Sequence, residues 1–430
     1  MSYAVLGYGR SSKVVIEYLL SKGEEDIVLY LPQKEWEVAK KDYLHIAIRD
    51  LDAPICEGVI VRSPGLRPDR ENIMRAKANG SRLTQEVEMF LGACPALVYG
   101  VTGSDGKTTT ATLASKMLEA EGNTVWLGGN IGTPPLTFLN QVTPRDKVVL
   151  ELSSFQLMTF APHLTASAVT NLTPNHLNWH RDLDEYTMAK RHILLHAARR
   201  VQNAHSMIAP ELSSITFSVS YEGANYHLKE GKLYRGDTIL CDTGDILLPG
   251  MHNYENMLCA AALTGASGES VRDVATTFRG VHHRMEYVGE IGGRHCYNSS
   301  IDTTPSRTAV TLAAIPYPMT IICGGYDKHL SMEPLTQALM KYGARVVFTG
   351  GNGKDMMAHL TSHPAYEGTP SCRYIAPFSE AVQMAYRETP VGEAVVLSPA
   401  AASFDAFSSY EERGEAFCQI FGKMKSAFGG

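Results

Sequence analysis

The chain has 430 residues, 44% of which are hydrophobic, and it carries a net charge of −6. This length exceeds what one hydrophobic core supports, and the acidic balance argues against a general nucleic-acid-binding protein. The eight cysteines are scattered without a Cys-x-x-Cys pair, and no uncharged apolar run is long enough to span a membrane. We therefore expect a cytoplasmic protein of several domains with reduced cysteines.

The chain opens with the pattern of a Rossmann-like unit. The apolar strand 3–6 leads into Gly7-Tyr8-Gly9-Arg10-Ser11-Ser12, and an amphipathic helix is predicted over 13–22. The third glycine of the dinucleotide fingerprint is missing, and Tyr30 stands where a nicotinamide site has an acidic residue. Two interpretations stay open, a nucleotide-like ligand other than NAD and a strand–helix turn with no ligand.

A second polar segment follows the buried strand 58–61. It reads Arg62-Ser63-Pro64-Gly65, and it lies at the carboxyl end of the strand, where open α/β sheets bind their ligands. Helices are predicted over 69–79 and 84–91, before a link at 93–95 into the next segment.

The stretch 96–110 has the order strand, glycine-rich loop, helix. Its loop reads Gly103-Ser104-Asp105-Gly106-Lys107-Thr108-Thr109. Such a loop directs backbone N–H groups toward an anion, the lysine adds a cation for phosphate oxygens, and a threonine hydroxyl can reach Mg²⁺. Only two residues separate the glycines, fewer than in the standard P-loop, so a tight turn with a solvated lysine is the alternative.

Polar residues also follow three further predicted strands, 124–127, 147–150 and 166–169. A parallel sheet would collect these residues at the edge that holds Lys107, and they are Asn130, Glu151, Ser153 and His176. Glutamate and hydroxyl oxygens suit Mg²⁺. His176 and His180 have a spacing found in zinc sites, but without a His-Glu-x-x-His motif or a cysteine ligand zinc is disfavoured.

The rest of the central segment is less informative. A helix is predicted over 184–199, and its periodicity alone makes Lys190 and Arg191 a solvated basic face. Residues 213–248 alternate and turn like an antiparallel insert, and a helix of small residues follows over 251–266.

A third segment begins near residue 281. It starts with a predicted hairpin, 285–290 paired with 295–298, and it continues with the buried strands 320–323, 345–348 and 394–397. Polar residues follow these strands as well, which predicts a second Rossmann-like unit with its own ligand-binding edge.

Taken together, these motifs resemble the Mur ligases of peptidoglycan synthesis over nearly the whole chain, most closely the branch that adds D-glutamate. The resemblance rests on runs 101–109, 129–132, 151–156, 171–176, 252–256, 283–284, 324–328 and 397–405. It implies an α/β protein of three domains: a Rossmann-like uridine-nucleotide domain over 1–93, a P-loop ATPase-like domain with a parallel or mixed sheet over 94–280, and a Rossmann-like amino-acid-binding domain over 281–430.

The resemblance implies an ATP-dependent amide ligase that uses Mg²⁺ or Mn²⁺. Such an enzyme phosphorylates the carboxylate of UDP-N-acetylmuramoyl-L-alanine, and the amine of D-glutamate displaces the phosphate. We expect a monomer that binds these small molecules, without nucleic acid or a membrane span. A Mur-superfamily ligase with another amino acid or acceptor, such as a sibling Mur ligase or a folylpolyglutamate synthetase, and a catalytically inactive nucleotide-binding protein are the alternatives.

Site residues follow from the resemblance position by position. ATP contacts are assigned to Gly103, Ser104, Asp105, Gly106, Lys107, Thr108, Thr109, Asn253, Asn256, Arg284 and Asp302. Metal ligands are assigned to Thr109, Glu151, His176 and Lys190, of which Lys190 matches a lysine that becomes carbamylated. Lys107, Glu151, His176 and Lys190 are the predicted catalytic residues. Substrate contacts are assigned to Arg10, Ser11, Ser63, Pro64, Gly65, Asn130, Ser153, Thr303, Lys328, Ser403, Phe404 and Tyr410.

The chain departs from the family pattern at a few of these positions. Ser299 replaces a common aspartate, and we expect Asp302 to supply that carboxylate. Ile301 stands where some members carry a lysine near the D-glutamate carboxylate, and Tyr30 replaces an acidic residue on the uracil side. These departures concern the two substrate ends more than the ATP loop.

Overall fold

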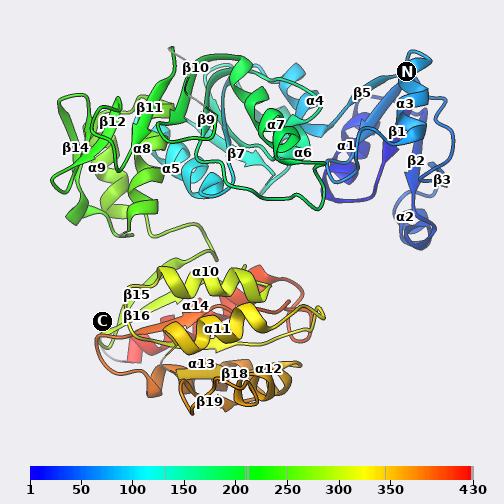
Figure 1. The fold of residues 1–430 in the computed structure, drawn as a ribbon. Helices are drawn as coiled ribbons and strands as arrows, with labels where there is room; N and C mark the ends of the chain where they lie inside the picture. The colour runs from blue at the N-terminus through cyan, green and yellow to red at the C-terminus, as the bar shows by residue number, and fades with distance from the viewer. Residues whose placement is uncertain (131, 209, 211–212, 249, 344, 428–430) are drawn as a thin grey trace. The chain divides into compact units, whose positions relative to one another are not determined.

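The computed structural model describes residues 1–427 except 131, 209, 211–212, 249 and 344. The chain divides into two compact units, Met1–Phe278 and Arg279–Gly430 (Figure 1). The predicted α/β class is confirmed, with three sheets of parallel or mixed strands. The predicted domain boundaries at residues 93 and 280 stay predictions. Within the described part of the chain, no helix is both long and apolar enough to cross a membrane.

The first sheet of the 1–278 unit has five parallel strands in the order β3-β2-β1-β4-β5. Alternate residues of β1 face opposite cores, so that Val5 packs with α1 and α4 while Leu6 packs with α3. The elements are β1 (Tyr3–Leu6), α1 (Arg10–Ser21), β2 (Ile27–Leu31), α2 (Trp36–Asp42), β3 (Ala47–Asp50), β4 (Val59–Arg62), α3 (Glu71–Ala78), β5 (Arg82–Thr84) and α4 (Glu86–Ala93).

The second sheet of this unit has nine strands in the order β14-β13-β12-β11-β10-β9-β6-β8-β7. Its strands are parallel from β7 to β12, and β13 and β14 add an antiparallel edge. The strands are β6 (Leu97–Thr102), β7 (Val125–Gly129), β8 (Lys147–Glu151), β9 (His163–Val169), β10 (His196–Asn203), β11 (Ile215–Ser218), β12 (Tyr226–Lys229), β13 (Lys232–Arg235) and β14 (Thr238–Asp242).

Helices cover both faces of this nine-stranded sheet. Val148 and Leu150 of β8 pack in one core with α6 and α7, and Val149 between them packs in the other with α5, α8 and α9. The first of these cores continues without a break into the five-stranded sheet. The helices are α5 (Lys107–Ala120), α6 (Ser154–Leu157), α7 (Leu183–Leu195), α8 (Met251–Thr264) and α9 (Gly268–Thr277), and a short 3-10 turn, η2, spans Pro135–Thr137.

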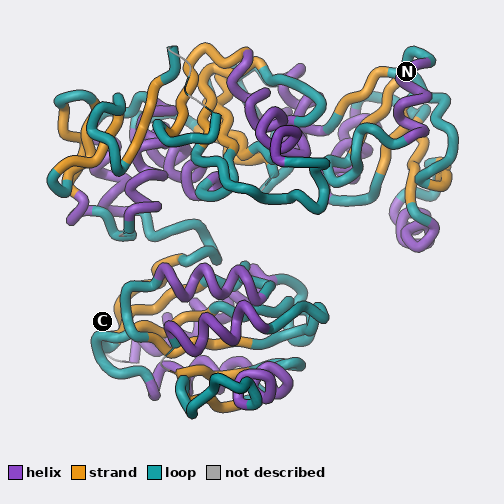
Figure 2. The backbone as a smooth tube through the Cα atoms, viewed as in Figure 1, coloured by secondary structure: helices purple, strands orange, loops and turns teal. Residues whose placement is uncertain are grey.

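The 279–430 unit holds a six-stranded sheet in the order β15-β16-β20-β17-β18-β19, parallel except for the predicted β15–β16 hairpin. Ile321 of β17 packs with α10, α11 and α12, and its neighbour Ile322 packs with α13 and α14 on the opposite face. Helices accordingly lie on both faces of this sheet (Figure 2). The elements are β15 (Glu286–Ile291), β16 (Arg294–Asn298), α10 (Pro305–Ala314), β17 (Met319–Cys323), α11 (Glu333–Tyr342), β18 (Arg345–Phe348), α12 (Gly353–Thr361), β19 (Ser371–Tyr374), α13 (Phe378–Glu388), β20 (Ala394–Leu397) and α14 (Tyr410–Ala427).

Two element predictions are wrong in part. The helix predicted over 184–199 ends at Leu195, and β10 begins at His196 because its backbone pairs with β9 and β11. The predicted antiparallel insert over 213–248 is antiparallel only from β12 onward, since β11 and β12 pair in parallel.

Candidate active site

The loop between β6 and α5 depends on its two glycines. Gly103 has a φ of +152°, and a Cβ there would collide with the hydroxyl of Thr170. Gly106 has a φ of +74° at the N-cap of α5, and a Cβ there would collide with the amide of Asn256. Only glycine fits both positions without strain, so the short glycine spacing is required by this backbone.

Contacts from the loop after β9 fix the position of this glycine loop. The backbone N–H groups of Ser104 and Asp105 donate to the carbonyl and the side-chain oxygen of Asn171, at 2.9 and 2.8 Å. The hydroxyl of Ser104 lies 2.7 Å from that of Tyr186 on α7, and the hydroxyl of Thr170 donates to the Asp105 carbonyl. The glycine loop is therefore held in place by its neighbours before any ligand binds.

Glu151 lies at the end of β8, next to the start of α5. Only 2% of its surface is exposed, and its carboxylate accepts from the Thr108 hydroxyl at 2.6 Å and from the Asn130 amide at 3.2 Å. Lys107, the residue before Thr108, donates to the Ser104 carbonyl at 2.8 Å. The structure thus brings Lys107, Thr108, Asn130 and Glu151 together, as the strand-end argument predicts; the Mg²⁺ contact assigned to Thr109 stays a prediction.

Lys190 of α7 is buried, so the solvated basic face predicted from periodicity is wrong for this residue. Its side chain is 2% exposed, and Nζ donates to the Gly103 carbonyl at 2.7 Å. Burial lowers the pKa of Lys190 well below its usual range, and the nearby Lys107 lowers it further. The shift favours the neutral amine, which is the nucleophilic form of lysine. Its neighbour Arg191 is only half-buried.

His176 stands in the loop after β9 with a φ of +56°. Desolvation lowers its pKa, and the ammonium groups of Lys107 and Lys190 lower it further. The imidazole is thus neutral near pH 7, which is the form that binds a metal. A buried carboxylate, a threonine hydroxyl and a neutral imidazole fit Mg²⁺ or Mn²⁺. His180 instead donates or accepts inside the protein, with Ser154 at 2.9 Å and Glu185 at 3.3 Å.

Two further predicted residues of this unit have local structural contacts. Ser153 is the N-cap of α6 and forms a capping box with Gln156. Asn256 of α8 accepts from the Thr110 hydroxyl at 3.3 Å, beside Gly106, and Asn253 lies in the first turn of the same helix. The substrate contact of Ser153 and the ATP contacts of both asparagines stay predictions.

The predicted uridine-side residues lie where the two sheets of the 1–278 unit meet. Arg10 donates to the Gly132 carbonyl at 2.9 Å from the first turn of α1, which also contains Ser11. After β4, the Pro64 carbonyl accepts from Arg62, and the Gly65 carbonyl accepts from the Trp179 indole. Ser63, the residue before Pro64, donates its N–H to the Leu6 carbonyl.

Arg62 and Tyr30 point into the protein rather than toward a ligand. Arg62 is 1% exposed, and its guanidinium also donates to the Phe155 carbonyl at 2.8 Å, which ties the end of β4 to α6. Burial raises the pKa of Tyr30 to about 12, and its hydroxyl donates to Glu57 at 2.8 Å. The tyrosine that replaces the family's acidic residue therefore serves an internal hydrogen bond.

In the 279–430 unit, the predicted amino-acid residues follow three strands. After β17, the Lys328 ammonium donates to the Thr303 hydroxyl at 2.9 Å, and burial lowers the pKa of Lys328, with Arg413 and Arg307 as further positive charges. After β20, Ser403 is 2% exposed, and Phe404 is 68% exposed beside the Tyr326 ring. A cation and exposed aromatic surface therefore occur together at this edge of the sheet.

Arg413 of α14 is a residue that the sequence reasoning missed. Its guanidinium is 2% exposed and donates to the hydroxyl and carbonyl of Ser300 at 3.0 and 2.9 Å, and to the carbonyls of Ala401 and Ala402 at 3.1 Å. The Tyr410 carbonyl accepts from the Ser300 hydroxyl at 2.7 Å. One side chain thus fixes the two loops that carry Thr303 and Ser403.

Asp302 and Arg284 lie in the same unit. Asp302 is 5% exposed, and its Oδ2 accepts from the hydroxyls of Thr311 and Ser398 at 2.6 and 2.8 Å. Both of these hydrogen bonds of Oδ2 lie inside the unit, and the ATP contact assigned to Asp302 stays a prediction. Arg284 follows His283 in the link between α9 and β15 and donates its N–H to the Val281 carbonyl; its phosphate contact stays a prediction.

Comparison with known proteins assigns the chain to a family. The Mur ligase middle domain matches residues 101–264. UDP-N-acetylmuramoylalanine–D-glutamate ligase of Clostridium perfringens is 37% identical, with 97% of this chain and 95% of the relative covered. The ligase of the same name from Acetivibrio thermocellus is also 37% identical, over 98% and 96% of the two chains.

Solved structures share the fold. UDP-N-acetylmuramate–alanine ligase MurC of Thermotoga maritima has a TM-score of 0.59 at 19% identity, with 100% of both chains covered. MurF of Acinetobacter baumannii has a TM-score of 0.55 at 14% identity, with 98% of this chain and 90% of that chain covered. The identity over nearly the full length places the chain among the Mur ligases, in the family of UDP-N-acetylmuramoylalanine–D-glutamate ligases.

Proposed function

We propose that the protein is an ATP-dependent ligase that joins D-glutamate to UDP-N-acetylmuramoyl-L-alanine in peptidoglycan precursor synthesis. The observation that carries the proposal is the cluster in which Thr108 and Asn130 meet the buried Glu151 carboxylate, beside a phosphate-type loop. It occurs in a chain that matches a D-glutamate ligase over 97% of its length. We also propose the cytoplasm as its location and a monomer as its state.

The reaction needs two displacements at phosphorus and carbon. A carboxylate oxygen of the substrate attacks the γ-phosphorus of ATP, and ADP leaves. The amine of D-glutamate then attacks the acyl carbon, loses a proton and displaces inorganic phosphate. Both steps depend on aligned anions and on neutralised charge rather than on covalent help from the protein.

Residues of the 1–278 unit would bind the phosphates and the metal. The N-terminus of α5 and the Lys107 ammonium would hold phosphate oxygens, after Lys107 releases the Ser104 carbonyl. Mg²⁺ or Mn²⁺ would be held by Glu151, His176 and the Thr109 hydroxyl. The ion would supply positive charge to the transferring phosphoryl group. His176 binds as the neutral imidazole that its lowered pKa provides.

Lys190 would act as a carbamate. The neutral form of its amine can attack CO₂ and lose a proton, which gives a carboxylate-like anion beside Lys107. The carbamate would attract the Lys107 ammonium, whereas a protonated Lys190 is repelled by it. In the other unit, Lys328, Thr303 and Ser403 would receive the carboxylates of the incoming amino acid, and Phe404 and Tyr410 would line its path.

Phosphate release from ATP tests the proposal. The full-length protein is assayed with UDP-N-acetylmuramoyl-L-alanine and a panel of D-glutamate, L-glutamate, L-alanine and diaminopimelate, with UDP-N-acetylmuramate and a folate as alternative acceptors. Release that requires both UDP-N-acetylmuramoyl-L-alanine and D-glutamate is expected. Release with another pair would assign the chain to a sibling activity, and no release with any pair would refute the ligase.

A further inference from the structure

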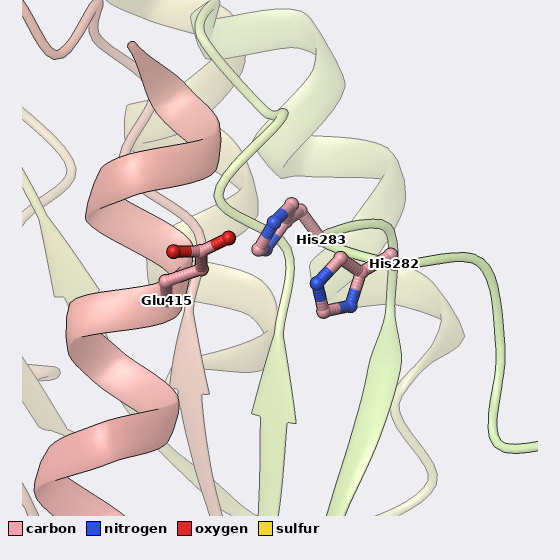
Figure 3. Close-up of side chains that lie close together, drawn as sticks. All are labelled: His282, His283 and Glu415. Atoms are coloured by element: carbon pink, nitrogen blue, oxygen red, sulfur yellow. The ribbon is translucent and has the colours of Figure 1, made fainter. Parts of the chain in front are cut away.

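Two histidines and a glutamate meet in the 279–430 unit, and the proposed reaction uses none of them. His282 and His283 lie in the link before β15, and Glu415 lies on α14 (Figure 3). One potential ligand atom from each residue lies within 4.8 Å of the other two. No other group of three such residues occurs in the part of the chain that the structure describes.

The buried member, His283, is placed by two features of the backbone. It has a φ of +59°, a left-handed conformation that is uncommon outside glycine. Its imidazole lies against α14 at Gly414, where a Cβ would collide with the ring. Because position 414 has no side chain, the ring approaches the helix closely and lies beside Glu415, the next residue (Figure 3).

Glu286 orients the exposed histidine and faces the buried one. Its Oε1 lies 2.8 Å from Nδ1 of His282, and its Oε2 lies 4.0 Å from Nδ1 of His283. A carboxylate on Nδ1 holds the proton on that nitrogen and leaves the Nε2 lone pair free for a metal. Glu286 thus supports the Nδ1–H tautomer of His282, and its second oxygen lies near Nδ1 of His283.

We propose that His282, His283 and Glu415 bind one divalent transition-metal ion of the Zn²⁺ type. Two imidazole nitrogens and a carboxylate are a common three-ligand set for Zn²⁺, with water in the fourth position. Metal–ligand bonds of about 2.0–2.2 Å at tetrahedral angles put the ligand atoms about 3.3 Å apart, so the three atoms must move inward. His282 and Glu415 are exposed and can turn toward the ion.

Metal binding changes one hydrogen bond. Nδ2 of Asn298 lies 3.0 Å from Nδ1 of His283, which accepts there while Nε2 carries the proton. With a metal on Nε2, the proton resides on Nδ1 and the ring turns its N–H from Asn298 to Glu286 Oε2. Asn298 keeps its own bond to that carboxylate at 3.0 Å, so no buried donor is lost.

The ligand set also sets the preference among metals. Imidazole nitrogen favours Zn²⁺, Co²⁺, Ni²⁺ and Cu²⁺ over Mg²⁺, which prefers oxygen ligands. The site is therefore chemically distinct from the cluster around Glu151, and it does not depend on the ligase activity. Millimolar Mg²⁺ should leave it unchanged.

Zn²⁺ titration against a chromophoric chelator tests the site in the full-length protein, with excess Mg²⁺ present throughout. We expect the wild-type protein to bind one more equivalent of Zn²⁺ than the H282A/E415Q double variant. Glu286→Gln should weaken that equivalent by about 10- to 100-fold, as the loss of a supporting carboxylate does elsewhere. Zn²⁺ should also raise the Tm of the wild-type protein and not that of the double variant.

His329→Ala is the matched control, because His329 is an exposed histidine beside Asp327 in the same unit. It should bind Zn²⁺ as the wild-type protein does. If the double variant unfolds without metal, Glu415→Gln alone decides, since it changes an exposed helical position. Equal Zn²⁺ stoichiometry and affinity in the wild-type and variant proteins, or displacement of Zn²⁺ by Mg²⁺, would overturn the proposal.

Discussion

Glu86 makes the stability of the 1–278 unit depend on pH, and replacing it with glutamine should remove that dependence. Glu86 begins α4, is 4% exposed, and accepts from the Leu136 N–H at 2.8 Å where η2 meets the helix. Burial raises its pKa from 4.5 to about 7, against a smaller opposing effect of that hydrogen bond. Glutamine has the same shape and can accept from the same N–H.

The size and sign of the effect follow from linkage. A carboxyl whose pKa is higher in the folded state binds more protons when folded, so the free energy of unfolding falls as pH rises from 4.5 to about 7. The rise in pKa corresponds to a total loss of about 3 kcal/mol, complete above pH 7. Glu86→Gln should match the wild-type protein below pH 4.5 and exceed its stability by about 3 kcal/mol at pH 8.

Urea unfolding followed by tryptophan fluorescence measures this unit selectively. All three tryptophans of the chain, Trp36, Trp126 and Trp179, lie within it, and Trp126 stacks on Phe138 at 5.3 Å, next to Phe90 of α4. Glu71→Gln, on the exposed face of α3, is the control and should leave the pH dependence unchanged. A constant difference between wild-type and Glu86→Gln from pH 4.5 to 8 would refute the assigned pKa.

Three further predictions concern turnover. Lys107→Ala should abolish phosphate release while Lys116→Ala, on the exposed part of α5, should not; a near-normal kcat for Lys107→Ala would refute the phosphate contact. Lys190→Ala should be inactive and partly recovered by short carboxylic acids that replace a carbamate, and recovery by neutral amides instead would contradict carbamylation. Arg413→Lys removes most of the four hydrogen bonds that Arg413 makes to the two loops. It should raise KM for the amino acid by about 10- to 100-fold and leave KM for ATP within about twofold of the wild-type value. Equal changes in the two KM values would indicate general unfolding.

The residues at the strand ends were predictable because buried parallel strands have a simple sequence pattern. Each buried strand is a short apolar run, and the polar residue after it must lie at one edge of the sheet, as Glu151 and Asn130 do. The glycines of the phosphate-type loop were predictable for a similar reason, since local backbone conformation demands them.

Long-range contacts explain what the sequence reasoning missed. Residues 194–199 are good helix formers, but β9 needs a neighbour, and pairing with it converts His196 onward to a strand. Lys190 has the periodicity of a surface residue, but it is buried where its Nζ donates to the Gly103 carbonyl, 87 positions earlier in the chain. Arg413 is one charged residue among several in α14, and its carbonyl partner at Ser300 lies 113 positions earlier.

The hydrogen bonds between the two sheets of the 1–278 unit have a consequence for substrate choice. Hydrogen bonds from Arg10, Arg62 and the Trp179 indole join parts of the two sheets. Arg67 pairs with Glu185 at 3.0 Å, and one hydrophobic core contains residues of both sheets. The predicted uridine-side residues and the phosphate-type loop therefore lie in the same compact unit. Under the proposed function, a nucleotide sugar at the predicted uridine side would need the right length to bring its carboxylate to the phosphate-type loop, and we expect a substrate longer or shorter by one residue to bind without reacting.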